Sequence, residues 1–259
     1  MQRVTLGKTG IETSRLCVGT GTNGWEHASN QTRLGQEAFT RIFERALDQG
    51  ITFWDGADQY GSHSFLANAK RGLDRGRLQI TTKTVARTAE EARADIPRFL
   101  KELETDYLDV VMLHCMTHRG WVEEREPVME VLTHAKEQGY IRALGVTCHN
   151  LGAFERAAET EWVEVNLCRI NHAGRHMDAA PEVVVPLLQR MHDRGAGTYG
   201  MKVMGCGDLR DDPAKAFRYV FDLDCLDAIS LGVENEAEID QAVHMMREHD
   251  RRGSALQPA

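Results

Sequence analysis

Eight short apolar segments alternate with eight longer amphipathic segments along this chain, and this alternation restricts the fold more than any other feature. Short apolar runs are typical of buried strands, whereas apolar residues at helical spacing, as in residues 35–49, indicate helices. A regular strand–helix alternation gives a parallel sheet with right-handed crossovers. Eight repeats in 259 residues predict an α/β fold, the closed (β/α)8 TIM barrel. No shift in composition marks a linker, so we expect one domain over residues 1–259.

The predicted elements follow this alternation from end to end. We expect strands over residues 15–19, 51–54, 78–83, 107–114, 141–147, 162–166, 198–204 and 226–231. We expect one helix to begin near residue 88 and the others to cover residues 35–49, 64–73, 126–138, 151–158, 181–194, 213–220 and 235–247. Residues 4–13 are predicted to form a β-hairpin that closes the bottom of the barrel. Residues 251–259 are predicted to form a polar tail.

A doubly wound open sheet is the alternative fold. It requires a glycine-rich turn after the first strand, and the run Gly19-Thr-Gly21-Thr-Asn-Gly24 has the spacing of that turn. The match is weak because residues 25–34 separate this run from the next helix. In addition, no acidic strand end follows this run at the spacing that a ribose contact requires. The barrel is therefore the preferred prediction.

Charge and cysteine content restrict the partners and the compartment. The net charge of -8 argues against a general nucleic-acid or anionic-membrane surface. The sequence contains no apolar run of about 18 residues, so we expect no membrane-spanning helix. The N-terminal residues lack the apolar core of a signal peptide. The six cysteines are scattered without a Cys-x-x-Cys pair, which predicts reduced thiols in a cytoplasmic protein.

Polar residues follow the predicted strands at the end where barrel proteins carry their chemistry. Asp55 ends the second strand and Tyr60 lies in the loop after it, while Lys83 and His114 end the third and fourth strands. One such residue alone is compatible with helix capping or with a satisfied core histidine. Several on consecutive strands are hard to explain by structure, because buried charges are costly unless they are paired.

These residue types can cooperate in acid–base chemistry. A phenol has a pKa of about 10, and we expect a nearby Lys83 ammonium to lower the pKa of Tyr60. Asp55 would hold Lys83 charged and oriented, and a neutral His114 could donate a hydrogen bond to a substrate carbonyl. Such a set can deliver a proton to a carbonyl oxygen while hydride reaches the carbon, a general-acid contribution of about 10²–10⁴-fold in rate.

The same segments carry a resemblance to a known family. The runs Phe53-Trp-Asp-Gly-Ala-Asp-Gln-Tyr-Gly61, Thr81-Thr-Lys83, Leu108-Asp-Val-Val-Met-Leu-His114 and Gly139-Tyr-Ile-Arg-Ala-Leu-Gly-Val-Thr147 resemble successive signatures of the aldo-keto reductase superfamily. The opening run Leu6-Gly-Lys-Thr-Gly10 resembles the N-terminal hairpin of that family. The resemblance implies a (β/α)8 barrel that binds NAD(P)H without a Rossmann fold. It also implies a catalytic tetrad, which maps onto Asp55, Tyr60, Lys83 and His114.

The resemblance further implies a set of cofactor contacts, some of which depart from the usual family residues. Thr147 and Cys148 stand in place of the usual Ser-Asn, Asn166 in place of a Gln, and Met201, beside Lys202, in place of a stacking aromatic. The loop before the last helix carries acidic residues and no Lys or Arg, which should repel a 2′-phosphate and favours NAD(H). The implied cofactor-binding residues are Gly21, Thr22, Thr147, Cys148, Asn166, Met201, Lys202, Gly232, Glu234 and Glu238.

The expected ligand is a small carbonyl or alcohol compound, with Trp25, His149 and Asn171 as candidate substrate contacts. Two alternatives remain at this stage. The altered nicotinamide contacts are compatible with a non-catalytic or regulatory barrel that binds a cofactor or partner. A metal site is the weaker alternative, and its candidate ligands are Cys115, Cys148, Cys168, Cys206, His114, His149 and His172. The sequence does not define the substrate, the oligomeric state or the direction of the reaction.

Overall fold

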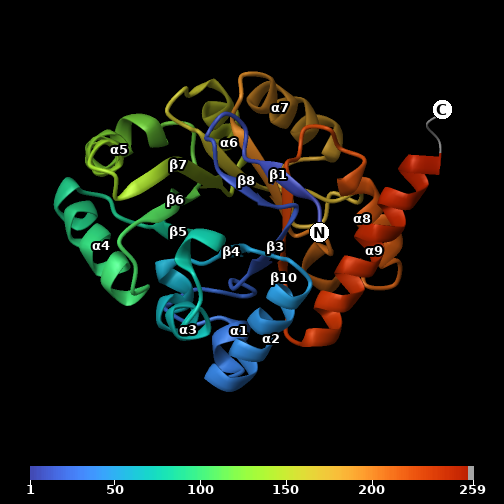
Figure 1. The fold of residues 1–259 in the computed structure, drawn as a ribbon. Helices are drawn as coiled ribbons and strands as arrows, with labels where there is room; N and C mark the ends of the chain where they lie inside the picture. The colour runs from blue at the N-terminus through green and yellow to red at the C-terminus, as the bar shows by residue number, and fades with distance from the viewer. Residues whose placement is uncertain (256–259) are drawn as a thin grey trace.

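The computed structural model describes the backbone of residues 1–255 and the side chains of residues 1–251. Within these residues eight parallel strands close into a barrel in the order β10-β3-β4-β5-β6-β7-β8-β9. Helices form a ring around the strands (Figure 1). An antiparallel two-stranded hairpin precedes the barrel. The predicted (β/α)8 barrel with an N-terminal hairpin is confirmed.

The element bounds lie close to the predicted ones for most of the chain. The strands are β1 (Arg3–Thr5), β2 (Glu12–Ser14), β3 (Leu16–Gly19), β4 (Phe53–Asp55), β5 (Gln79–Thr84), β6 (Leu108–Met116), β7 (Ile141–Cys148), β8 (Val165–Arg169), β9 (Gly197–Met201) and β10 (Ala228–Gly232). The helices are α1 (Asn30–Arg33), α2 (Gln36–Asp48), α3 (His63–Ala69), α4 (Ala89–Glu102), α5 (Trp121–Glu137), α6 (Leu151–Glu159), α7 (Pro181–Asp193), α8 (Pro213–Phe221) and α9 (Glu236–Ala255). Short 3-10 turns are η1 (Asp58–Tyr60), η2 (Arg75–Arg77) and η3 (Gly205–Gly207).

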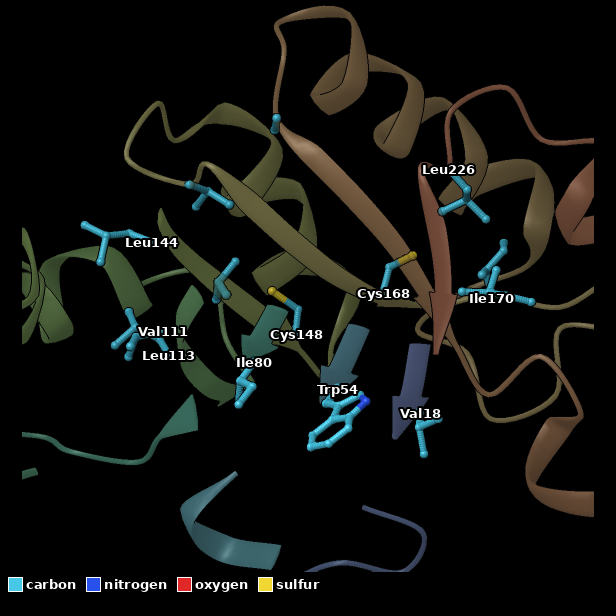
Figure 2. Packing of buried hydrophobic residues seen from close by; sticks show 14 of the residues in the cluster. Val18, Trp54, Ile80, Val111, Leu113, Leu144, Cys148, Cys168, Ile170 and Leu226 are labelled. Carbon is cyan, nitrogen blue, oxygen red and sulfur yellow. The ribbon is translucent and has the colours of Figure 1, made fainter. Parts of the chain in front are cut away.

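Alternation along each strand separates two apolar cores. On β6, Val110 and Met112 belong to the cluster that fills the barrel, whereas Val111 and Leu113 belong to the cluster between the barrel and the helices. Figure 2 shows side chains of this outer cluster, among them Trp54. Successive strand residues point to opposite faces, so the inner face of each strand is known once one residue has been assigned. This alternation fixes which strand-end residues can reach the mouth of the barrel.

The hairpin closes the bottom of the barrel, as predicted. Leu6 and Ile11, in the turn that joins β1 and β2, are fully buried and belong to the cluster inside the barrel. The backbone of Leu6 lies so close to β9 that a Cβ atom on Gly197 would come within 2.8 Å of the Leu6 Cβ atom. In Figure 1 the hairpin lies across one end of the barrel.

Two predicted boundaries are wrong, and a tryptophan side chain explains each difference. Helix α5 begins at Trp121, not near residue 126, and includes Pro127. The buried Trp121 indole donates to the Ala153 carbonyl and anchors this first turn to α6. Strand β8 covers Val165–Arg169 instead of residues 162–166, and the Trp162 indole donates to Thr133 on α5.

Helix α9 also differs from its prediction, because it extends to Ala255. Its apolar side, which includes Ile239, Val243 and Met246, is buried. The predicted polar tail is therefore helical through Ala255, and residues 256–259 lie outside the described residues. No helix in residues 1–255 has both the length and the apolar character that crossing a bilayer requires.

We expect Ile11→Ala to destabilise the protein by about 2–5 kcal/mol, because it removes buried methyl groups and leaves a cavity at the bottom of the barrel. Urea unfolding followed by circular dichroism measures this change. Thr5→Ala, on the exposed side of the same hairpin, is the control and should change the unfolding free energy by less than about 0.5 kcal/mol. Equal stability of Ile11→Ala and the wild type would contradict the role assigned to the hairpin.

Candidate active site

Three of the four tetrad candidates end strands on the inner face of the barrel. Asp55 follows Phe53 at the same parity on β4, and His114 follows Met112 on β6; both preceding residues belong to the inner cluster. Lys83 is on β5. After His114 the register of β6 against β7 shifts, and Cys115 takes a left-handed φ of 65°. This β-bulge ends the regular alternation immediately after the histidine.

A buried ion pair forms the base of the site. The Lys83 ammonium lies 2.8 Å from both carboxylate oxygens of Asp55 and donates to the Gly56 carbonyl, also at 2.8 Å. Lys83 is fully buried and Asp55 is 4% exposed. Burial is the largest influence on Lys83 and lowers its pKa, but the attraction of Asp55 and the neighbouring Tyr60 outweigh it and raise the pKa above the usual value. Lys83 therefore stays charged, as the sequence predicted.

Two further residues hold Asp55, and neither was predicted from the sequence. Thr81 Oγ1 donates to Asp55 Oδ1 at 2.5 Å, and the buried Tyr199 hydroxyl donates to the same oxygen at 2.9 Å. Both lie two residues before a predicted site residue, Lys83 and Met201 respectively. Period-two counting back from these strand ends could have found them.

Tyr60 reaches the same site from outside the strands. It ends η1, and Gly61 follows it with a left-handed φ of 63°. The Tyr60 ring packs so closely on the loop after β3 that a Cβ atom on Gly21 would come within 2.4 Å of it. The Tyr60 hydroxyl lies 3.2 Å from His114 Nε2, and the Lys83 ammonium lies 4.9 Å from the centre of the Tyr60 ring. The four candidate side chains therefore meet at one rim of the barrel.

Burial dominates the protonation of Tyr60 and His114. Desolvation raises the pKa of Tyr60, and the opposing effect of the Lys83 ammonium does not reverse it. Lys83 thus acts in the expected direction, but the pKa lies above its ordinary value because burial has the larger effect. Desolvation, assisted by the positive charge of Lys83, lowers the pKa of His114 well below its usual range. Near neutrality the site thus holds a protonated phenol beside a neutral imidazole.

The mouth above the tetrad combines an aromatic ring with cationic groups. The half-exposed Trp25 indole lies 5.7 Å from the His114 ring, centre to centre. Arg169, on the inner face at the end of β8, forms an ion pair with Asp178. Burial, together with the positive charges of Arg169 and Lys202, lowers the pKa of His149 to about 4. Arg169 was not predicted, because the apolar pattern ends this strand three residues too early.

Two predicted contacts face away from the mouth. Cys148 packs in the cluster between barrel and helices (Figure 2). Asn166 lies between the inner-face residues Val165 and Leu167, so it faces outward, and its amide donates to the Val146 carbonyl. The reason is the corrected position of β8, which moves Asn166 from the strand end to the strand start.

Asn171, predicted to contact substrate, is fully buried beneath the loop that follows β8. Its amide group donates to the carbonyls of Arg175 and Lys202, and its oxygen accepts from the backbone N–H groups of Ala173 and Arg175. The side chain is thus committed to bracing loops. The site proposed below leaves out Cys148, Asn166 and Asn171.

The remaining predicted cofactor contacts form two groups around the mouth. Thr147 and Met201 are on the inner face at the ends of β7 and β9, and Lys202 follows Met201. Thr147 Oγ1 accepts from the Cys115 N–H at 2.8 Å, which leaves its own hydroxyl hydrogen for another acceptor. The Lys202 ammonium has no hydrogen-bond partner within the described part of the chain.

The second group joins the first and last strands of the barrel. The buried Gln31 side chain bonds both the backbone N–H and the hydroxyl of Thr22 and also donates to the Val233 carbonyl. A Cβ atom on Gly232 would collide with the Thr22 hydroxyl at 2.1 Å, so only glycine allows this close approach. Gly21 precedes Thr22 in the same loop.

The acidic residues of the last loop are held in place. The Asn30 amide donates to Glu234 at 2.7 Å. Glu238 accepts the Glu234 N–H at 2.7 Å and the Asn235 amide at 3.1 Å, at the start of α9. These bonds keep negative charge at this edge of the mouth.

The metal alternative can be compared with the geometry of the described side chains. Among residues 1–251, Asp58, His63 and Glu102 are the metal-ligand types whose donor atoms lie within 4.8 Å of one another. This group contains none of the cysteines or histidines that the sequence suggested. The guanidinium of Arg98 donates to Asp58 at 2.7 Å and to Glu102 at 3.1 Å. These carboxylates are therefore already paired with a positive charge of the protein.

The fold and the placement of the polar residues define the chain as a (β/α)8-barrel protein with a polar site at the C-terminal rim of the strands. The model of the Aldo/keto reductase family matches residues 15–254. The chain belongs to this family.

Individual curated relatives match a smaller part of this chain than the family model does. The aldo-keto reductase YhdN of Bacillus subtilis (strain 168) is 33% identical over 164 residues, which cover 57% of this chain and 47% of that protein. The methylglyoxal reductase DkgB of Salmonella typhi is 29% identical over 129 residues, 48% of each chain. The chain thus spans about half the length of these curated relatives. The structure of aldo-keto reductase AKR11C1 from Bacillus halodurans (holo form) has a TM-score of 0.79 at 17% identity, covering 100% of this chain and 97% of that chain. At that identity the likeness supports the fold.

We expect stability to fall as the pH drops from about 6.5 toward 4. An unfolded histidine has a pKa of about 6.5, whereas folded His149 has a pKa of about 4. Between these values the unfolded state binds more protons, so acidification favours unfolding. Urea unfolding from pH 4 to pH 8 should show a flatter dependence for His149→Gln than for the wild type. Identical slopes for the two proteins would contradict the low pKa.

Proposed function

We propose that the protein is an NAD(P)(H)-dependent oxidoreductase that reduces an aldehyde or ketone, or oxidises the corresponding alcohol. The observation that carries this proposal is the convergence of Tyr60, His114 and the Lys83–Asp55 ion pair at one rim. The family match and the name of the relative methylglyoxal reductase DkgB support the same reaction class.

In the proposed mechanism Tyr60 is the general acid for reduction and the general base for oxidation. Its raised pKa keeps the phenol protonated near neutrality, which is the form that reduction requires. The Lys83 ammonium, held by Asp55, stabilises the phenolate that forms when the proton leaves. Neutral His114, 3.2 Å from the phenol oxygen, helps to orient the carbonyl oxygen by a hydrogen bond. A bound nicotinamide would supply or accept the hydride.

The donors around the mouth fit a nicotinamide cofactor. The free hydroxyl hydrogen of Thr147 suits a carboxamide oxygen, and the Met201 thioether can cover a ring by dispersion. The unpartnered ammonium of Lys202 suits a phosphate. We propose these three residues as cofactor contacts, with Gly21, Thr22 and Gly232 forming the adjacent wall. Trp25 and His149 are proposed to contact the substrate.

We propose a preference for NAD(H) over NADP(H). Asn30 holds the Glu234 carboxylate, and Glu238 stays at the start of α9, so a 2′-phosphate placed there would meet negative charge. Arg41 reaches this loop from α2, but it already pairs with Glu236 and Glu37. Carboxylates can instead accept hydrogen bonds from ribose hydroxyls.

We also propose that the protein works in the cytoplasm. All six cysteines are free thiols, and Cys206 is exposed. Unpaired thiols are the default in a reducing compartment. A small carbonyl or alcohol compound is the proposed partner.

Tyr60→Phe should lower kcat for carbonyl reduction by about 10²–10⁴-fold, because the variant loses the proton donor but keeps the ring that packs on Gly21. Oxidation of reduced cofactor, followed by absorbance with a panel of aldehydes and ketones, measures the loss. Binding of NADH to the variant, followed by protein fluorescence, should stay within about twofold of the wild type.

Tyr140→Phe, at an exposed tyrosine on the outer surface, is the matched control and should keep full activity. Full activity of Tyr60→Phe would remove Tyr60 as the acid. Failure of the wild type to bind either cofactor at millimolar concentration would instead favour the non-catalytic barrel.

Cofactor titrations test the preference separately. We expect NADH to bind the wild type about tenfold or more tightly than NADPH, because like charges placed together oppose binding. Glu234→Lys should reduce this ratio by favouring the 2′-phosphate. Glu130→Lys, on the exposed side of α5, makes the same charge change away from the mouth and should keep the wild-type ratio. Equal binding of NADH and NADPH by the wild type would refute the preference.

A further inference from the structure

Arg98, on α4 outside the barrel, is the centre of a polar network directly behind the proposed active site. Its guanidinium donates to Asp58 at 2.7 Å, to Asp95 at 2.6 Å and to Glu102 at 3.1 Å. Asp58 is almost fully buried, and the Arg98 side chain is 39% exposed. Hydrogen bonds to Asp58, with further contributions from Asp95, raise the pKa of Arg98 above its usual value, so the group is permanently charged.

Two arms of this network end on the strand residues that flank Lys83. Asp95 accepts a hydrogen bond from Thr84 Oγ1 at 2.5 Å. Glu102 lies 2.7 Å from Nδ1 of the buried His63, and His63 Nε2 lies 2.6 Å from Thr82 Oγ1. Thr82 and Thr84 are on the outer face of β5, because Lys83 between them faces inward. The backbone on both sides of Lys83 is thus tied to α4.

The third arm ends on the turn that carries Tyr60. Asp58 is the first residue of η1, and Tyr60 is its last. The Asp58 carbonyl also accepts the Gly61 N–H and faces His27 Nδ1 at 3.0 Å. The turn is also held by the Tyr60 N–H donating to the Ala57 carbonyl, by the packing of the Tyr60 ring against Gly21 and Gly24, and by the contact of its hydroxyl with His114. Arg98 thus connects the support of the phenol to the support of the ammonium.

We propose that Arg98 is a positioning residue that fixes Tyr60 relative to Lys83. Each of the two side chains belongs to a different segment, and a direct bond between these segments, from the Lys83 ammonium to the Gly56 carbonyl, lies four residues before Tyr60. Because one rigid guanidinium binds Asp58, Asp95 and Glu102, it holds the turn of Tyr60 at a fixed distance from the strand of Lys83. This inference rests on the proposed function for its effect on turnover, but the geometric claim stands independently of it.

The test compares Arg98→Gln with Asp58→Ala, which removes only the arm to the Tyr60 turn. Both variants should lower kcat by about 10- to 100-fold, because small displacements of a catalytic group are costly, while KM for NADH should stay within about twofold. Arg98→Lys should recover part of kcat because it restores the positive charge. Arg45→Gln removes a comparably exposed arginine that pairs with Asp240 on α9, and it should behave as the wild type.

A second readout does not need turnover. The Tyr60 phenol can be titrated by NMR in protein labelled with ¹³C at tyrosine Cζ, with Tyr60→Phe to assign the signal. Burial raises the pKa of Tyr60 more than the Lys83 ammonium lowers it. Loosening the turn admits water to the phenol and should therefore lower the Tyr60 pKa in Arg98→Gln and in Asp58→Ala, but not in Arg45→Gln.

The outcomes separate the two proposals. Absence of reductase activity in the wild type would overturn the proposed function, and the Tyr60 titration would then decide the role of Arg98 alone. An unchanged Tyr60 titration and an unchanged kcat in Asp58→Ala, with the protein folded, would overturn the positioning role. If Arg98→Gln fails to fold, Asp58→Ala and Arg98→Lys still provide both measurements.

Discussion

The structure of the site depends on the buried pair of Lys83 and Asp55. A charge in the apolar interior of a barrel is costly, and a pair is tolerated only when its remaining hydrogen-bonding capacity is filled. Here Gly56 accepts from the ammonium, while Thr81 and Tyr199 donate to the carboxylate. Asp55 and Lys83 are on the adjacent strands β4 and β5, whereas Tyr199 is on β9, so the full set of partners comes together only when the barrel is closed.

Around this rigid base the remaining groups are held by loops, and their positions depend on tight packing. The Tyr60 ring contacts the glycine loop after β3, and Gln31 fastens the same loop to the end of β10. Arg98 and its carboxylates support the Tyr60 turn from the outer side. A phenol enclosed in this way loses solvation, which explains why its pKa is raised despite the nearby ammonium. The proposed acid is therefore kept protonated by its enclosure. The Lys83 ammonium stabilises the phenolate that forms when the proton leaves.

The two sides of the mouth differ in charge, and this difference organises the proposed cofactor site. Arg169 ends β8 and Lys202 follows β9, and their positive charges help to keep His149 neutral. Glu234 and Glu238 follow β10, the strand that pairs with β9. A dinucleotide with its phosphates near the first group and an unmodified ribose near the second would meet complementary charge along its length.

The sequence by itself determined the architecture and the four residues that meet at the rim. The strand–helix alternation is repeated eight times, and Asp55, Lys83 and His114 each end an apolar run, so local patterns were sufficient to place them. Tertiary structure decided what local patterns do not contain. The start of β8 was set by Trp162 bonding to α5, and a shift of three residues turned Asn166 outward and left Arg169 at the strand end. Tyr199 and Arg98 reach Asp55 and Asp58 from 144 and 40 residues away. Such pairings are decided by the closure of the barrel and the docking of α4. Strand periodicity places Tyr199 on the inner face, but no spacing along the chain records that it meets Asp55.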